Sequence, residues 1–237
     1  MKRGEIVRHV SRGAFFLGLE KIAALFSGIA YFALLLRWLG PTKYGIMTLA
    51  LSFAGLATMA TGNFEVFLER YAAEYQARGD LLTLRRAHRL ALGLKLGLGL
   101  LASAALAALA PALSRHFAMP ELAVLLPLLT LIVATDGLAT TGRATLYGMQ
   151  RFEWVSALAV VFHVAKTALV GLLWYARQGL VELAWGLSLL TALQALVMSA
   201  APAWLLRRAG AAPPVPGPRP AGEPPAPELA TAAPVAA

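Results

Sequence analysis

Long apolar runs, separated by short polar segments, dominate the chain. Six of these runs hold roughly 18 to 25 residues each, which as α-helix measure about 27–38 Å, against a hydrocarbon core of about 30 Å. The pattern therefore predicts an all-α membrane protein, a bundle of six transmembrane helices. The expected spans are about Gly13–Leu36, Tyr44–Thr61, Leu90–Leu113, Leu122–Leu146, Trp154–Tyr175 and Leu183–Leu206.

The connections between the first spans have their own patterns. Gly40-Pro41 predicts a tight turn between the first two spans. After the second span, the segment Phe64–Arg78 is amphipathic, with Phe64, Phe67, Leu68 and Tyr71 on one helical face and its charges elsewhere. We expect this segment to form a cytoplasmic extension of the second helix or a helix on the membrane surface.

Composition supports a membrane protein. The 237 residues are 59% hydrophobic and only 14% charged, whereas soluble domains are about 25% charged. Without cysteine there can be no disulfide, thiol nucleophile or cysteine-bound metal. The apolar run from Ala14 to Leu36 is too long for the core of a signal peptide, and no small-residue cleavage site follows it. We expect it to remain as the first span.

The net charge is +9, and the positive charges lie in short loops between apolar runs, where they determine the topology of a membrane protein. We therefore expect no nucleic-acid partner. Cytoplasmic N- and C-termini give a strong positive-inside bias. Fourteen basic residues then face the cytoplasm: Lys2, Arg3, Arg8, Arg12, Arg70, Arg78, Arg85, Arg86, Arg89, Arg143, Arg151, Arg207, Arg208 and Arg219. Four face outward: Arg37, Lys43, Arg115 and Arg177.

The division of the chain follows from these patterns. Residues 1–12 form a basic cytoplasmic arm, and residues 13–208 form the six-span bundle. Residues 209–237 contain nine of the fourteen prolines and almost no large apolar side chain, which predicts a disordered cytoplasmic tail. The tail could also serve as a proline-rich ligand for a partner protein.

No motif indicates an enzyme, a cofactor or a metal site. The sequence contains no phosphate-binding loop, no HExxH and no paired-carboxylate motif for a magnesium diphosphate. The four histidines are far apart, without the spacing of metal ligands. Three glycines in the third span, Gly93, Gly97 and Gly99, are interpreted as sites of close helix packing.

Ionisable residues inside the spans are the candidates for function, since charge within a membrane usually faces the bundle interior or an aqueous cavity. Lys95 lies about one turn into the third span, so we expect it to snorkel to the cytoplasmic surface. Glu20 and Lys21 lie roughly 10 Å into the first span. They either face the bundle, reach partly toward the surface, or line a substrate cavity.

Three further ionisable residues lie in the fourth and fifth spans. If these spans form a hairpin at Gln150-Arg151, Asp136 and Lys166 both lie about 21–22 Å from the turn. His163 is one helical turn from Lys166. We therefore hypothesise a polar cluster of Asp136, His163 and Lys166 near mid-membrane. It is either an ion pair that fixes helix register or a cationic cavity that attracts a lipid diphosphate.

Two stretches of the chain resemble a known family. "LGPTKYGIMTLA" followed by "ERYAAEYQARGD", and then "YGMQRF" before the fifth span, are similar to the oligosaccharide-lipid flippases of the multidrug/oligosaccharidyl-lipid/polysaccharide exporter superfamily. The resemblance implies transfer of undecaprenyl-diphosphate-linked sugars from the cytoplasmic to the outer leaflet of a bacterial inner membrane. It also implies alternating access between two helix bundles around a basic cavity, without ATP.

Members of that family usually have about twice as many spans, so this chain resembles the N-terminal bundle alone. We expect a homodimer, a second half-transporter chain, or a truncated product. Two alternatives remain at this point. One is a membrane scaffold or partner subunit of a glycan-assembly complex. The other is a drug or peptidoglycan-precursor exporter of the same superfamily.

Overall fold

The computed structural model describes residues 3–210, and within them it contains six α-helices and no strand. The helices are α1 (Arg3–Met59), α2 (Glu65–Ala77), α3 (Leu81–His116), α4 (Leu122–Gly148), α5 (Phe152–Tyr175) and α6 (Leu180–Gly210). The predicted all-α membrane bundle is confirmed. Residues 3–12, expected as a basic arm, form the first turns of α1. The disordered tail was expected to begin at residue 209, whereas α6 continues to Gly210, and the rest of that segment, from residue 211 onward, lies outside the described residues.

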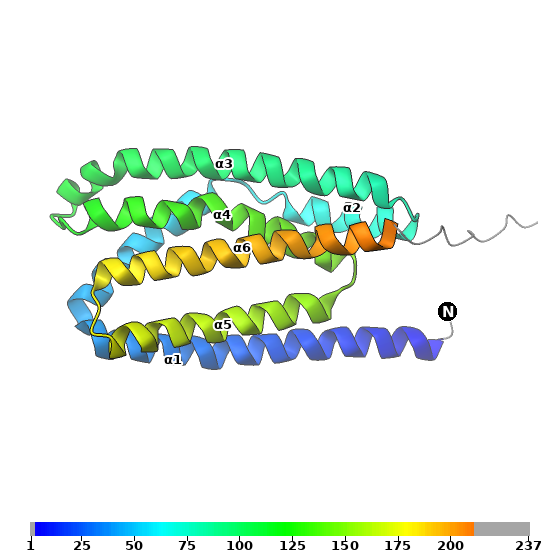
Figure 1. Cartoon of the computed structure of the whole chain (residues 1–237), viewed down its shortest axis with the longest axis horizontal. Helices are drawn as coiled ribbons and strands as arrows, with labels where there is room; N and C mark the ends of the chain where they lie inside the picture. Colours follow the sequence, from blue (N-terminus) through cyan, green and yellow to red (C-terminus); the bar gives the residue numbers. More distant parts are fainter. Residues whose placement is uncertain (1–2, 211–237) are drawn as a thin grey trace, which may run out of the picture.

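The helix α1 is two helices joined at a reversal. Gly40 has φ 72° and ψ 170°, which is a left-handed backbone that glycine adopts without strain, and Pro41 follows it. The chain turns back at this point, as Figure 1 shows at the end of the bundle opposite the N-terminus. The predicted Gly40-Pro41 turn is therefore confirmed, and residues 3–39 and 41–59 form separate rods.

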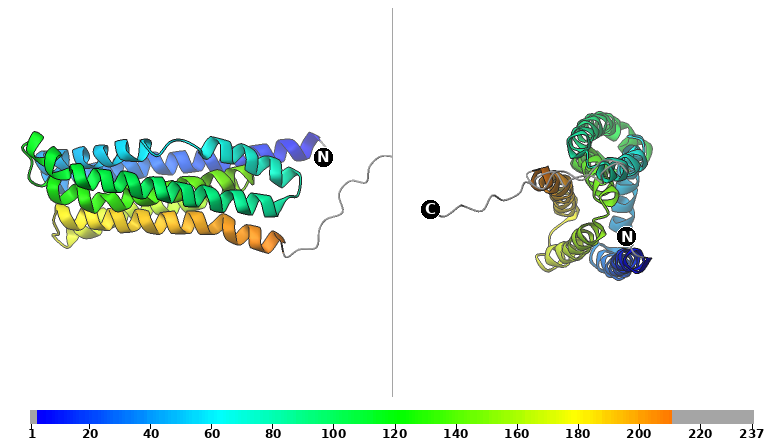
Figure 2. Two further views of the ribbon diagram at one scale, coloured as in Figure 1. Left: turned by 90° about the horizontal axis from the view of Figure 1, so that it is seen from above. Right: turned by 90° about the vertical axis from the view of Figure 1, so that its right-hand side faces the viewer.

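Within residues 3–210, five helices are long and apolar enough to cross a membrane when α1 is counted once: Phe15–Met59, Leu81–His116, Leu122–Gly148, Phe152–Tyr175 and Leu180–Arg208. Since α1 reverses at Gly40, this described part of the chain contains six segments of crossing length. The segment after Gly40 is prolonged by α2 across a short break, so Phe64–Arg78 does extend the second rod (Figures 1 and 2).

The helix α4 is the centre of the bundle. It packs against every other helix, most extensively α3 and α6, whereas α5 packs mainly on α1. Viewed along the bundle axis in Figure 2, α5 and the first part of α1 lie on one side, and α2 and α3 lie on the other. The core includes Leu122, Leu126 and Leu129 of α4, which are fully buried.

Glycines let three helices approach α4 closely. A Cβ atom on Gly99 of α3 would lie 2.8 Å from the Ala134 carbonyl oxygen, and one on Gly148 of α4 would lie 2.5 Å from the Glu69 carbonyl oxygen. Gly142 of α4 lies directly against the backbone of Met198 in α6. The expectation for Gly93 and Gly97 was wrong, since a Cβ atom there would meet open space.

Candidate functional site

One face of α4 carries a stripe of polar side chains. Asp136, Thr140, Arg143 and Tyr147 are spaced by four, three and four residues, so they lie above one another on a single helical face. Asp136 is within electrostatic range of Glu65, Lys95 and Arg143. Arg143 is also within range of His163 on α5. The stripe therefore lies within electrostatic range of two polar clusters, one that includes Glu65 and Lys95 and one that includes His163.

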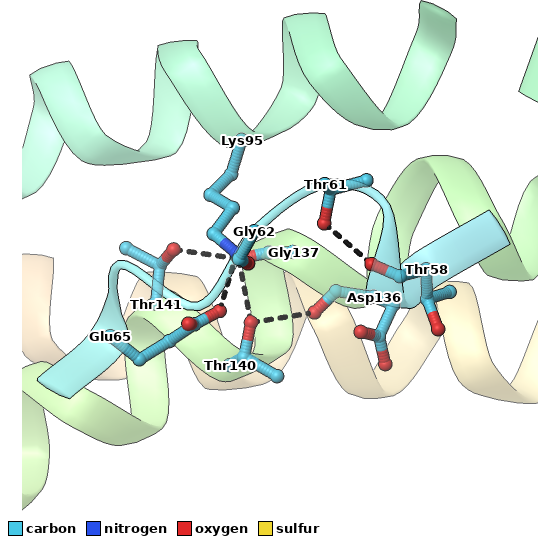
Figure 3. Close-up of polar contacts among 9 residues, drawn as sticks. All are labelled: Thr58, Thr61, Gly62, Glu65, Lys95, Asp136, Gly137, Thr140 and Thr141. Atoms are coloured by element: carbon cyan, nitrogen blue, oxygen red, sulfur yellow. Dashed lines mark hydrogen bonds and ion pairs between the residues drawn. The ribbon is translucent and has the colours of Figure 1, made fainter. Parts of the chain in front are cut away.

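The first group, which we call the Lys95 cluster, consists of Gly62, Glu65, Lys95, Asp136 and Thr140 (Figure 3). Lys95 is only 3% exposed. Its ammonium lies 2.7 Å from a carboxylate oxygen of Glu65 and donates a hydrogen bond of 2.5 Å to the Gly62 carbonyl oxygen. The other Glu65 carboxylate oxygen, Oε2, is buried and has no hydrogen-bond partner within the described residues.

The break between α1 and α2 provides two of these groups. Gly62 has a φ of 78°, and a Cβ atom on residue 62 would lie 2.9 Å from the Phe64 ring, so a larger residue would be strained there. The Lys95 ammonium lies 5.6 Å from the centroid of the Phe64 ring, within the range of a cation–π interaction. One helix thus ends beside the ammonium, and the next begins there with Glu65.

The absence of a side chain at Gly137 makes room for Lys95 to reach this break. A Cβ atom on Gly137 would lie 2.9 Å from the Lys95 Cβ and 3.1 Å from its Cδ, so the lysine stem passes directly over α4. Thr140 interacts with the Glu65 carboxylate from the same helix, and Thr141 donates a hydrogen bond of 2.6 Å to the Gly137 carbonyl. The cluster is therefore enclosed by α2, α3 and α4.

The second group, which we call the His163 cluster, consists of Glu20, Lys21, Tyr31, His163 and Lys166. Glu20 is 5% exposed and accepts a hydrogen bond of 3.4 Å from Ser156 of α5. The Lys166 ammonium lies 4.5 Å from the centroid of the Tyr31 ring. His163 is within electrostatic range of Glu20, Lys21 and Lys166, and Lys21 is exposed. Tyr31 keeps a buried hydroxyl with no hydrogen-bond partner within residues 3–210.

Hydroxyl groups hold this cluster in place. The Ser27 hydroxyl of α1 donates a hydrogen bond of 2.7 Å to the His163 carbonyl oxygen and lies 2.7 Å from the Thr167 hydroxyl oxygen. The first part of α1 and α5 are therefore joined next to the charged residues. This contact orients α5 so that the face with His163 and Lys166 is turned toward α1.

The predicted grouping of Asp136 with Lys166 was wrong. Within the described residues no ion pair joins them, and Asp136 lies with Lys95 and Glu65 instead. The prediction assumed that consecutive helices pack as a hairpin, but α5 packs mainly on α1. His163 and Lys166 do lie near each other, as their spacing predicted, together with Glu20 and Lys21.

The expectation that Lys95 snorkels to the surface was also wrong. The third span was expected to begin at Leu90, whereas α3 begins at Leu81. Lys95 is therefore about 21 Å from the start of the helix, too far for its side chain to reach the end. Glu65 and Arg143 were not among the predicted site residues. The spacing of Arg143 from Asp136, seven residues, is the signal that could have identified it.

Within residues 3–210, the structure brings together no group of three or more His, Cys, Asp or Glu side chains able to hold a metal ion. The polar groups that it does bring together are two lysine-containing clusters inside an apolar bundle. The fold and these clusters define a multi-pass α-helical membrane protein with a charged interior. Such interiors are typical of transporters.

The family is shown by comparison with family models. The model described as "Polysaccharide biosynthesis protein" matches residues 10–213, most of the chain. The protein therefore belongs to the polysaccharide biosynthesis protein family, whose members are transporters or flippases rather than enzymes. Neither the curated proteins nor the solved structures gave a significant match.

Proposed function

We propose that this protein moves a lipid-linked oligosaccharide, carried on a diphosphate lipid, across a bacterial inner membrane during the synthesis of a cell-surface polysaccharide. The observation that carries the proposal is the excess of positive charge in the His163 cluster. Lys21, Lys166 and the nearby Arg143 are the cationic groups within electrostatic range of His163, and Glu20 is the one carboxylate within that range in the described residues. A diphosphate is the anion that such a site would attract.

Two donors in this region support a ligand. The Tyr31 hydroxyl and the Arg143 Nε are buried, and neither has a hydrogen-bond partner within residues 3–210. Buried polar groups are normally paired, so an unpaired donor needs an explanation, and a bound anion is one. In this proposal Lys166 and Arg143 bind the diphosphate, His163 and Glu20 tune the charge, and Lys21 attracts the headgroup. Asp136, seven residues before Arg143 on the same face of α4, attracts that guanidinium electrostatically.

The proposal is tested with the full chain in proteoliposomes that contain a fluorescent diphosphate-linked oligosaccharide. Lys166→Ala is expected to reduce transfer at least tenfold while the protein inserts normally, and Lys166→Arg is expected to retain most of it. Lys43→Ala removes an equal charge from an exposed position just after the Gly40 turn and should not change transfer. Full transfer by stably inserted Lys166→Ala would contradict the proposal.

A second bundle completes the transporter in this proposal, either from another copy of the chain or from a partner chain. Alternating access needs two bundles that rock against each other. Co-purification of two differently tagged copies tests the homodimer. If only one tag is recovered and transfer is absent without another membrane protein, the partner chain is favoured.

The same assay addresses the other two functions. A drug or peptidoglycan-precursor exporter would move those substrates in preference to the diphosphate-linked oligosaccharide. A membrane scaffold would move none of them and would lose its partners when residues 213–237 are deleted.

A further inference from the structure

Two oxygen atoms contact the Lys95 ammonium, and both are of kinds that also bind metal cations. A carbonyl oxygen freed at a helix break, Gly62 O, lies on one side, and a Glu65 carboxylate oxygen lies on the other (Figure 3). Helix breaks in membrane transporters commonly bind Na⁺ through such carbonyl oxygens. Hard cations also prefer carboxylate and carbonyl oxygens. In this chain, the position among these oxygens is taken by a side-chain ammonium.

We propose that the Lys95 ammonium occupies this site in place of an alkali metal ion. It thereby stabilises the break between α1 and α2 without a bound metal ion. The charges of the side chains in the Lys95 cluster support this assignment. Glu65 and Asp136 are the two carboxylates of the cluster, and their charges act on each other. Lys95 is 3% exposed, and its side chain is placed between α2 and α4. Without its charge, the two carboxylates would be left in an apolar bundle.

The break itself depends on the same ammonium. The Gly62 carbonyl has no helical partner, because the chain leaves α1 at Met59 and re-enters a helix at Glu65. A carbonyl without a partner is costly within a membrane protein. Lys95 satisfies that carbonyl and the Glu65 carboxylate together. Removing the side chain beyond Cβ leaves both oxygens, and space where an ion with its water could bind.

The experiment measures the apparent unfolding temperature of the purified full chain in detergent. The medium contains NaCl, KCl or choline chloride at one ionic strength. The wild-type protein is expected to unfold at the same temperature in all three. Lys95→Ala is expected to unfold roughly 5–10 °C lower in choline, because a buried charge has lost its partner. Na⁺ or K⁺ should restore at least half of this loss. Lys43→Ala, at an exposed position, should behave as the wild type.

A double variant keeps the test decisive if Lys95→Ala does not fold. Lys95→Met combined with Glu65→Gln removes both charges of the pair, so it should purify, unfold above Lys95→Ala and show no response to alkali ions. Four results would overturn the assignment: a wild-type protein whose stability needs Na⁺ or K⁺, a Lys95→Ala variant as stable as wild type in choline, a Lys95→Ala variant that Na⁺ and K⁺ stabilise no more than choline does, or a double variant no better than Lys95→Ala. The readout is stability, so it is independent of whether the chain moves a lipid-linked oligosaccharide.

Discussion

The Nδ1 atom of His88 lies 2.9 Å from the hydroxyl oxygen of Thr145, at the junction of three helices. The Nε2 atom of the same ring lies 3.3 Å from the Ser199 carbonyl oxygen. His88 is 1% exposed, so one imidazole joins α3 to α4 and α6 inside the bundle. An imidazole with both nitrogens bonded is a structural tie that no apolar side chain can replace.

His88→Ala should therefore destabilise the bundle by about 1–3 kcal/mol, because the Ser199 carbonyl loses its side-chain donor and the ring leaves a cavity. Thermal unfolding in detergent measures the change. His116→Ala is the matched control, since His116 lies exposed at the last turn of α3 and should alter the unfolding temperature little. Equal effects of the two substitutions would show that the His88 hydrogen bonds contribute nothing.

Gly142 permits the closest helix contact at the centre of the bundle. Its Cα faces the backbone of Met198, so a methyl group there must push α6 away from α4. Gly142→Ala is expected to cost about 1–3 kcal/mol and to lower the yield of folded protein. Gly97→Ala, where a Cβ atom meets nothing within 4 Å, should be neutral or slightly stabilising. If both variants unfold at the wild-type temperature, the α4–α6 contact is less tight than described.

The membrane-spanning helices could be predicted because the length of an apolar run and the residues of a turn are local properties of the sequence. The Gly40-Pro41 reversal and the break between the second span and the segment that begins at Phe64 were both predicted from the local sequence. The start of α3 could not be read in this way. Arg85, Arg86 and Arg89 resemble a polar loop, yet they lie on helical turns that begin nine residues before Leu90.

The neighbours of each helix were the part that the sequence did not determine. Helix rise places Asp136 along the axis of α4 but does not specify which helix its face meets. That choice depends on close contacts such as those at Gly137 and Gly142, which bring α3 and α6, and not α5, onto α4. His163 and Lys166 were grouped correctly because their spacing lies within one helix.

Asp80 makes the start of α3 sensitive to acid. Its carboxylate accepts a hydrogen bond of 3.0 Å from the Thr83 backbone N–H, and hydrogen bonds from the Thr83 hydroxyl and backbone hold the pKa of Asp80 below its ordinary value. A lowered pKa means that the folded state favours the charged form. The stabilisation is therefore complete above the ordinary pKa and is lost as the pH falls through the lowered one.

Asp80→Asn keeps the capping geometry without the charge, so its stability should lose this part of the pH dependence. Unfolding temperatures of the two proteins between about pH 2.5 and 6 are expected to converge at the acid end. Glu121→Gln at the start of α4 is the control, because Glu121 makes no capping hydrogen bond. If the unfolding temperature of Asp80→Asn follows the wild-type curve over the whole pH range, the Asp80 cap is not the source of the acid sensitivity.

The orientation of the bundle is the last prediction. The N-terminal end of α1, the α4–α5 connection and the end of α6 lie at one end of the bundle, and the α3–α4 connection lies at the other (Figure 1). The first end carries Arg151, Arg207 and Arg208, so the positive-inside rule places it in the cytoplasm.

The chain has no cysteine, so single cysteines can report each side without background. In intact cells, an impermeant maleimide should label Glu121→Cys at once. It should label Arg151→Cys only after the membrane is opened. Both positions are exposed, so a difference in labelling reports sidedness and not burial. The reverse pattern would place the basic end outside and would require another explanation for the charge asymmetry.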